Sequence, residues 1–422
     1  MMLISKKFSI DFIWNVVSLT ILGFSGIIIN ILIAHYYGPE ELGIFNQVFA
    51  FYIVLSQFSV LGIHYSVLKH VSYNQENIDR ISAIVISAII LCLALASVFA
   101  FFTYISRELI GNLMHSSGVG VGLGLVAPGL VGFAINKVLF NMFNGLNHMR
   151  SYAVFQALRY LLILVGVVLV IVFSLPGNYL AGSLTFAELV LLIVMGSYTF
   201  IVVLPVRLAA VCSKWFEEHL SFGARGFLSG ALTEINTRVD VLTIGFFLTD
   251  KMVGIYSFAA IISEGFSQLS IVVRRNVDPL IGASFSKNNL FQIQEYSKKI
   301  KRIFPPFMII LAIAAVFIYP IGLDIIVKDT DFNQSLWIFG ILMIGVTINA
   351  FYRPFLGILL QGDRPGHNTL MVGILVVINF IGNIILIPIL GILGAAIATA
   401  CAYVLEGLLI KYFSKKLLGI NL

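Results

Sequence analysis

The chain has 422 residues, of which 59% are hydrophobic and 11% are charged, and its mean hydropathy is +1.01. Soluble globular domains carry about 25% charged residues, so this composition excludes them and indicates a polytopic membrane protein. The three cysteines, Cys92, Cys212 and Cys401, are too far apart for a disulfide framework or a metal cluster. We therefore expect neither a metal nor a cofactor.

We predict about twelve membrane-spanning helices, since each requires about 20 mostly apolar residues. The predicted spans are 10–34, 44–68, 81–105, 118–140, 153–174, 186–209, 223–248, 252–273, 303–323, 334–358, 368–389 and 391–413. The first run is longer than the apolar region of a signal peptide, so we expect it to be retained. The longest polar connection, 274–302, could hold an amphipathic helix on the membrane surface.

Basic residues indicate how the chain crosses the membrane. If the N-terminus is cytoplasmic, the inner connections hold most of them, including Arg274 and the cluster in 298–302. The outer connections hold only Arg107, Lys251 and Lys328. This bias predicts that both termini are cytoplasmic. It also explains the net charge of +6, so no nucleic-acid partner is expected.

The sequence contains an internal repeat. Residues 33–45, IAHYYGPEELGIF, align without gaps on 244–256, IGFFLTDKMVGIY, and LSQFSV at 55–60 aligns on FSQLSI at 266–271. Both alignments have the same offset, because 254 − 43 and 268 − 57 are both 211. Chance matching of apolar text is the alternative, but glycine, serine and glutamine agree at one unbroken offset.

The repeat predicts an all-α fold of two six-helix lobes with a central cavity between them. Six helices in each half give the two copies the same orientation, so the lobes should be related by a pseudo-two-fold axis along the membrane normal. The predicted divisions are an N-terminal lobe at 1–211, a cytoplasmic linker at 212–222 and a C-terminal lobe at 223–422.

The predicted span 223–248 is unusually polar for a membrane helix. It carries Arg225, Glu234, Asn236, Arg238 and Asp240. An ionisable group at the centre of a membrane helix costs at least about 2.5 kcal/mol, so several together require a watery or protein-lined environment. In a continuous helix Arg225, Asn236 and Asp240 share one face, which we interpret as a cavity wall. Glu234 and Arg238 have the i,i+4 spacing of an ion pair. Alternatively, all these charges neutralise one another inside the bundle.

Other predicted spans carry polar groups that could face the same cavity. They are Gln57 in the second span, Arg159 and Tyr160 in the fifth, Glu264 and Gln268 in the eighth, and Tyr352 and Arg353 in the tenth. Asp11, Lys137 and Arg353 lie near helix ends, and for each of them we favour extension of the side chain to the interface. The run GVGVGLG at 118–124 lacks the lysine of a phosphate loop and suits close helix packing.

Three segments indicate a family. YYGPEELGIFNQVFAFYIVLSQFSVLGI, RVDVLTIGFFLTDKMVGIYSFAAII and NFIGNIILIPILGILGAAIATACAYV resemble the O-antigen and polysaccharide flippases of the multidrug/oligosaccharidyl-lipid/polysaccharide exporter superfamily. The resemblance covers nearly the whole chain. It implies a bacterial inner-membrane protein that moves an undecaprenyl-pyrophosphate-linked oligosaccharide from the cytoplasmic to the periplasmic leaflet by alternating access. It also implies a cationic lumen, and a polysaccharide polymerase and a chain-length regulator as protein partners.

The chemistry of such a substrate suggests roles for these residues. Arginine binds a diphosphate well because its planar fork donates paired hydrogen bonds and stays charged when desolvated. We therefore expect Arg159, Arg225 and Arg238 to bind the anionic headgroup. The remaining substrate-binding candidates are Asn236, Gln268, Gln57, Tyr160, Tyr352 and Arg353. Glu264 and Asp240 are the candidates for coupling to H⁺ or Na⁺, and permanent pairing with an arginine is the alternative.

Two other functions remain open. A drug/cation antiporter of the multidrug and toxin extrusion type would favour an acidic cavity with aromatic residues. A membrane-embedded polysaccharide polymerase or ligase would be expected to have a large periplasmic loop, whereas the outer loops predicted here are short. The sequence contains no nucleotide-binding motif and no nucleophile with a nearby base, so we expect a transporter and not an enzyme.

Overall fold

The computed structural model describes residues 6–204, 213–287, 289–327 and 329–422, which form helices and connections without a strand. Cys212, Lys328 and the side chain of Asp11 lie outside what it describes. The chain forms two compact units. Unit 1 comprises residues 1–29 and 44–234, and unit 2 comprises 30–43 and 235–422. The predicted all-α fold is confirmed.

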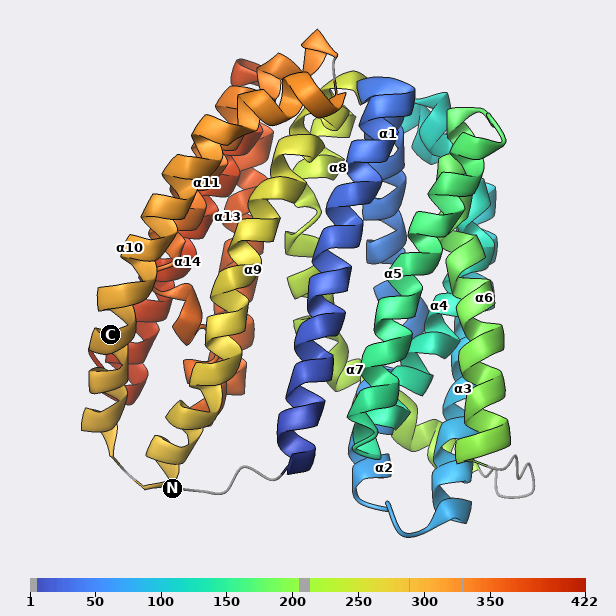
Figure 1. The fold of residues 1–422 in the computed structure, drawn as a ribbon. Helices are drawn as coiled ribbons and strands as arrows, with labels where there is room; N and C mark the ends of the chain where they lie inside the picture. Colours follow the sequence, from blue (N-terminus) through green and yellow to red (C-terminus); the bar gives the residue numbers. More distant parts are fainter. Residues whose placement is uncertain (1–5, 205–212, 288, 328) are drawn as a thin grey trace. The chain divides into compact units, whose positions relative to one another are not determined.

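Unit 1 is a bundle in which α4 packs on α3, α5 and α6 (Figure 1). Helix α1, Lys6–Val60, contributes to both units. The other elements of unit 1 are α2 (Ile63–Ser72), α3 (Ile78–Leu113), α4 (Ser117–Gly145), α5 (Met149–Val172), η1 (Gly177–Ala181), α6 (Gly182–Tyr198), η2 (Thr199–Val203) and most of α7 (Ser213–Asn236).

Unit 2 is a bundle in which α14 packs on α11 and α13, and α11 also packs on α9 and α10. Its elements are α8 (Val239–Phe247), α9 (Asp250–Ser286), α10 (Leu290–Gly322), η4 (Leu323–Val327), η5 (Thr330–Gln334), α11 (Ser335–Asn349), η6 (Arg353–Phe355), α12 (Ile358–Gln361), α13 (Pro365–Leu390) and α14 (Ile392–Leu418). The compact units differ from the predicted lobes, because residues 30–43 belong to unit 2 and residues 223–234 to unit 1.

Ten helices in the described part of the chain are long and apolar enough to cross a membrane, compared with about twelve predicted. Helix α1 accounts for one difference, since it has 55 residues and a non-helical residue, Gly38, at φ 80° and ψ −175°. Pro39 follows, and the ribbon turns back there (Figure 1). At 1.5 Å per residue the two arms of α1 together would measure about 80 Å, more than twice the thickness of a bilayer core. Its two arms therefore correspond to the predicted span 10–34 and to most of the predicted span 44–68, whose last residues lie in α2.

The second difference is the predicted span 223–248, which is not one continuous helix. Helix α7 ends at Asn236 and α8 begins at Val239, with Arg238 at φ −124° and ψ −7°. The shared face that we predicted for Arg225 and Asp240 assumed continuous helical geometry, so that expectation is wrong. Broken helices occur at membrane depth where protein or water can satisfy the freed backbone groups, and this break lies among polar side chains.

Unit 2 contains a reciprocal contact between two glycines. A Cβ on Gly43 would lie 1.8 Å from the carbonyl oxygen of Asp250, and one on Gly254 would lie 1.8 Å from that of Pro39. Only glycine permits this approach of backbones. The pairs have the offset of the sequence repeat, because 254 − 43 and 250 − 39 are both 211. The contact supports a two-fold relation between the repeats, and the relation of the complete lobes stays a prediction.

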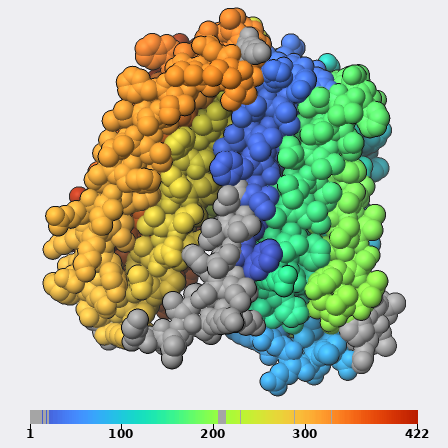
Figure 2. All heavy atoms as spheres, viewed as in Figure 1, coloured from blue at the N-terminus to red at the C-terminus, as the bar shows by residue number. Residues whose placement is uncertain are grey.

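The outer face of α10 shows how unit 2 meets the membrane. Ile303, Ile310 and Phe317 are 71%, 70% and 75% exposed. They are seven residues apart, or about two helical turns, so they form one stripe. Figure 2 shows α10, in orange, on the surface of unit 2. An apolar stripe of this kind is suited to lipid and not to water.

The glycine-rich run of α4 packs tightly, as predicted. A Cβ on Gly120 would lie 3.0 Å from the carbonyl oxygen of Arg107 on α3, and one on Gly118 would lie 2.5 Å from Ile44 Cδ1 on α1. These glycines let α4 approach both neighbours closely. The prediction that this run serves helix packing is therefore confirmed.

Candidate functional site

Unit 1 holds a charged group at the junction of four helices. The guanidinium of Arg159 on α5 forms an ion pair with Glu188 on α6, which is 1% exposed. The Tyr52 hydroxyl donates a hydrogen bond of 2.9 Å to Glu188 Oε1, and Asn136 Nδ2 donates one of 2.9 Å to Oε2. Arg159 also lies over the ring of Phe133, with Cζ 4.5 Å from the centroid. The predicted substrate residue Arg159 is thus already neutralised by an acid.

Lys137, which follows Asn136 of this group on α4, points into unit 1. Its Nζ donates a hydrogen bond of 2.9 Å to Gln57 Oε1, and its ammonium lies 5.3 Å from the centroid of the Phe133 ring. Extension to the membrane interface, the reading that we considered for Lys137, is therefore wrong.

Unit 2 contains a group of the same composition. Asn349 Nδ2 on α11 donates a hydrogen bond of 2.5 Å to Glu406 Oε2 on α14, and Arg353 Nη1 lies 3.5 Å from the same oxygen. The Arg353 guanidinium is 5.7 Å from the centroid of the Tyr403 ring. Extension to the interface is wrong for Arg353 too, because Glu406 supplies a counter-charge inside the unit.

The two predicted coupling acids also lie in unit 2. Asp240 is 8% exposed, and its carboxylate accepts hydrogen bonds from the Tyr256 hydroxyl and, at 2.9 Å, from the Val241 amide. The Tyr256 hydroxyl is also 3.2 Å from Thr399 Oγ1. Glu264 is half-buried and interacts electrostatically with three other predicted site residues, namely Arg238, Asp240 and Arg353. Unit 2 therefore brings four of the predicted residues into one charged group.

The remaining predicted residues have varied surroundings. Asn236 ends α7, and its Oδ1 is buried with no hydrogen-bond partner in the described part of the chain. Gln268 on α9 is exposed, and Tyr352 lies 3.8 Å below the Lys301 ammonium. Tyr160 is half-buried and lies within electrostatic range of its neighbour in sequence, Arg159.

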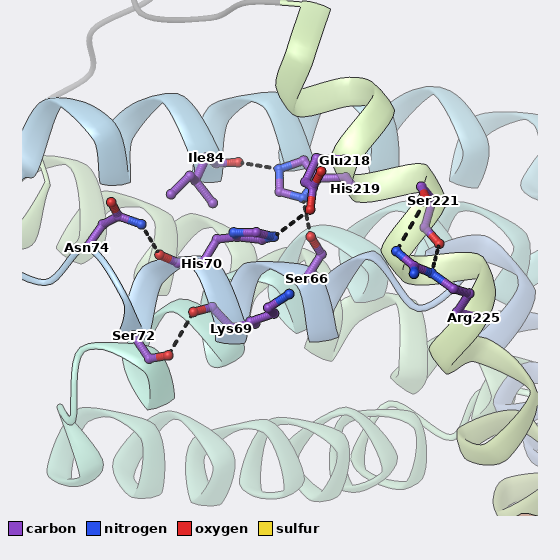
Figure 3. A network of polar contacts seen from close by, with 10 residues as sticks. All are labelled: Ser66, Lys69, His70, Ser72, Asn74, Ile84, Glu218, His219, Ser221 and Arg225. Atoms are coloured by element: carbon purple, nitrogen blue, oxygen red, sulfur yellow. Dashed lines mark hydrogen bonds and ion pairs between the residues drawn. The ribbon is translucent and has the colours of Figure 1, made fainter. Parts of the chain in front are cut away.

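Arg225 lies beside a separate polar network that joins α2 to α7 (Figure 3). Its side chain is exposed, and Nε donates a hydrogen bond of 3.1 Å to the Ser221 carbonyl oxygen. His219, fully buried, contacts Ser66 Oγ at 2.9 Å and the Ile84 carbonyl oxygen at 3.0 Å. Burial lowers the pKa of His219 to about 4.

A second histidine completes this network. His70 Nε2 lies 3.3 Å from Glu218 Oε1, and its ring packs 5.3 Å from that of Trp215. Burial lowers the pKa of His70, while the nearby Glu218 carboxylate opposes the shift. Arg225 thus lies beside the polar network between α2 and α7, and not in the group around Arg159.

The sequence interpretation missed both carboxylates that hold the arginines. Glu188 and Glu406 are isolated acids in the apolar runs FAELVLLIVM and YVLEGLLI. An isolated acid in a membrane helix is costly unless it has a partner, so this signal was readable. The arginine that each acid selects depends on how α5 packs on α6 and how the end of α11 packs on α14.

Comparison with known proteins shows the family to which the chain belongs. The chain matches the model of the polysaccharide biosynthesis protein family over residues 11–273, more than half of its length. It is 28% identical over 185 residues to the probable low-salt glycan biosynthesis flippase Agl15 of Haloferax volcanii, covering 43% of this chain and 39% of that protein. It is 24% identical over 412 residues to the probable flippase AglR of the same organism, covering 92% of this chain and 79% of AglR.

The fold is similar to that of solved transporters. An inward-facing multidrug resistance MATE family transporter of the MOP superfamily superposes with a TM-score of 0.78 at 11% identity, covering 93% of this chain and 95% of that one. The lipid II flippase MurJ, in an inward closed conformation, superposes with a TM-score of 0.77 at 15% identity, covering 96% and 88%. This chain is therefore a multi-pass membrane protein of the polysaccharide biosynthesis protein family, with the fold of the MOP superfamily transporters.

Proposed function

We propose that the protein is a flippase that moves an undecaprenyl-pyrophosphate-linked oligosaccharide from the cytoplasmic to the periplasmic leaflet of a bacterial inner membrane. The main support is the presence of charged groups inside the membrane helices of both units, in a chain of a polysaccharide biosynthesis family. A glycan cannot cross lipid unaided, so its carrier needs a polar interior while the prenyl tail stays in the bilayer.

The substrate would interact with both units by alternating access. Arg238 and Arg353 in unit 2 would attract the diphosphate, while Asn236, Gln268 and Tyr352 offer hydrogen bonds and an aromatic face for sugar. In unit 1, Gln57, Tyr160 and Arg225 are separate candidates for contact with the substrate, and Arg159 would contribute only by exchanging Glu188 for the substrate anion.

Coupling to H⁺ or Na⁺ would use Asp240 and Glu264. Glu264 is the more informative residue, since it lies among the charges of Arg238, Asp240 and Arg353. We expect Glu264→Gln to abolish the dependence of flipping on an imposed ion gradient while leaving substrate binding intact. Unchanged gradient-dependent flipping in the variant would exclude Glu264 from coupling.

The function itself is tested by deleting the gene and complementing the deletion with the full chain. Loss of surface polysaccharide, with accumulation of the lipid-linked precursor in the inner leaflet, is the expected result. If polysaccharide is unaffected and resistance to cationic drugs falls, the antiporter is the correct function. If the precursor reaches the outer leaflet but is not polymerised, the protein acts as a polymerase or ligase.

A further inference from the structure

Lys137 is a membrane-embedded cation whose described hydrogen bond goes to a neutral group. Its Nζ is 2.9 Å from Gln57 Oε1. An ammonium has three N–H donors, so this bond occupies one of them. By contrast, Arg159 on the next helix is paired with the carboxylate of Glu188. The charge of Lys137 is thus the less compensated of the two.

Gln57 is oriented to present an acceptor to this ammonium. Its side-chain Nε2 lies 3.3 Å from the Ile53 carbonyl oxygen and 3.2 Å from Ser56 Oγ, and donates to both. The amide is 7% exposed, so both ends of its side chain are constrained. Lys137 is therefore held in a defined position instead of sampling the interface, as its long stem would otherwise allow.

His64 on α2 contributes a second polar group. It is 5% exposed, and its Nδ1 has no hydrogen-bond partner in the described part of the chain. His64 lies within electrostatic range of Lys137. A buried ring nitrogen without a partner costs free energy unless a ligand or water satisfies it.

The acid that interacts with Lys137 comes from a different helix. Glu234 on α7 attracts Lys137, and Arg159 repels it. Glu234 is two residues before the end of α7, where the chain passes into unit 2. A carboxylate at this position would compete with an incoming anion for Lys137 and so favour its release.

We propose that Lys137, supported by Gln57 and His64, binds the phosphate groups of the lipid-linked substrate in unit 1. This inference rests on the proposed function and adds a residue to it. Lysine binds phosphate as a point charge, and the two remaining N–H donors of Lys137 suit two phosphate oxygens. We expect Lys137 to prefer a diphosphate to a neutral sugar, because an ammonium within the membrane is stabilised more strongly by a negatively charged ligand than by a neutral one.

The test uses the full-length protein in nanodiscs and compares Lys137→Gln with the wild type. The matched control is Lys69→Ala, which removes a unit 1 lysine whose ammonium packs 4.6 Å from the Phe222 ring. The probes are undecaprenyl pyrophosphate, inorganic pyrophosphate and phosphatidylglycerol, with affinity measured by native mass spectrometry. We expect Lys137→Gln to weaken undecaprenyl pyrophosphate binding about tenfold or more, with partial recovery in Lys137→Arg and little change in the control.

The outcomes separate this site from the proposed function. Equal affinity of folded Lys137→Gln and wild type for all three probes overturns the site. Equal loss of phosphatidylglycerol and undecaprenyl pyrophosphate binding overturns the assignment to substrate, because bilayer lipid would then be the ligand. If wild type binds the diphosphate lipid through Lys137 but flips no glycan, the site stands and the proposed function fails.

Loss of folding in Lys137→Gln is addressed by a second variant. Gln57→Leu keeps the ammonium and removes the group that orients it. We expect this variant to bind undecaprenyl pyrophosphate several-fold more weakly than the wild type while still showing a cooperative thermal unfolding transition. Wild-type affinity in a folded Gln57→Leu protein would contradict the site independently of Lys137→Gln.

Discussion

Each unit pairs a partly buried arginine with a glutamate, and the two glutamates differ in how deeply they are buried. In unit 1, Glu188 is 1% exposed and accepts hydrogen bonds from Tyr52 and Asn136 as well as pairing with Arg159. In unit 2, Glu406 is 14% exposed, and Arg353 is 3.5 Å away. An asparagine from the fourth predicted span of each half contacts the acid from the sixth.

The difference between the two arginine–glutamate groups suggests different roles for the two units in transport. Both carboxylate oxygens of Glu188 already have partners, so Glu188 has little capacity to exchange them. We therefore expect the group around Glu188 to stabilise the fold of unit 1 and to stay unchanged during transport. Unit 2 has a looser pair and two more acids, Asp240 and Glu264, close to Arg238. We therefore expect charge movement during transport to occur mainly in unit 2.

The strongest test of this comparison is Glu188→Ala. It leaves the buried Arg159 without a counter-charge, so we expect a loss of about 3–5 kcal/mol in the free energy of unfolding. Chemical denaturation of the purified protein in detergent measures this loss. The control is Glu217→Ala on the exposed face of α7, which should change stability by less than about 0.5 kcal/mol. Equal effects of the two variants would refute the supporting role of Glu188.

Acidification should next weaken unit 1 through His219. The folded-state pKa of about 4 is below the ordinary value of 6.5, so the folded protein binds the proton less readily than the unfolded one. The stabilisation is complete above about pH 6.5 and is lost as the pH falls towards 4, by on the order of 3 kcal/mol. Thermal unfolding between pH 7 and pH 4 measures it. His219→Gln should remove this part of the pH dependence, and an unchanged profile would contradict the assignment.

Removing the acid of unit 2 should have a smaller effect than removing that of unit 1. Glu406→Ala leaves Asn349 and Arg353 without their shared acceptor, but the Glu406 carboxylate is more exposed than that of Glu188, 14% against 1%, and its contact with Arg353 is long, at 3.5 Å. We expect a loss of about 1–3 kcal/mol in the free energy of unfolding, measured under the same denaturing conditions as Glu188→Ala. A loss as large as that of Glu188→Ala would mean that the two units do not differ in this respect.

The smallest expected effect comes from the hydroxyl that contacts Asp240. Tyr256→Phe removes one hydrogen bond to the buried carboxylate without changing the shape of the ring. We expect a loss of about 1 kcal/mol in stability, together with a shift in the ion dependence of flipping. Tyr412→Phe, at a 51% exposed position, is the control and should change neither quantity. An unaltered ion dependence in Tyr256→Phe would separate Asp240 from coupling.

The elements predicted best are those with local chemical causes. Gly38 and Pro39 separate the two arms of α1, because glycine adopts positive φ and proline begins a helix readily. The break between α7 and α8 was not predictable in this way. Thr237 and Arg238 occur in ordinary helices, and only their surroundings in the folded protein permit the helix to stop there.

In the candidate site, too, some features could be predicted from the sequence and others depend on packing. The sequence identifies Arg159 and Arg353 as buried cations in apolar helices, but the choice of partner depends on side chains more than 25 positions away. Lys137 is the clearest example. Its place near a predicted helix end favoured the interface, and Gln57, distant in sequence by 80 positions, holds it inside instead. Local pattern indicates which charges are costly, and packing decides how each is compensated.

The glycines at 43 and 254 carry an evolutionary consequence. In a symmetric homodimer of a six-helix ancestor, one glycine per subunit would have made both close contacts, because each subunit presents the same surface to the other. A single mutation in that ancestor would have damaged the pairing twice. In the present chain the two positions can change independently, yet each is confined to glycine by the backbone beside the other.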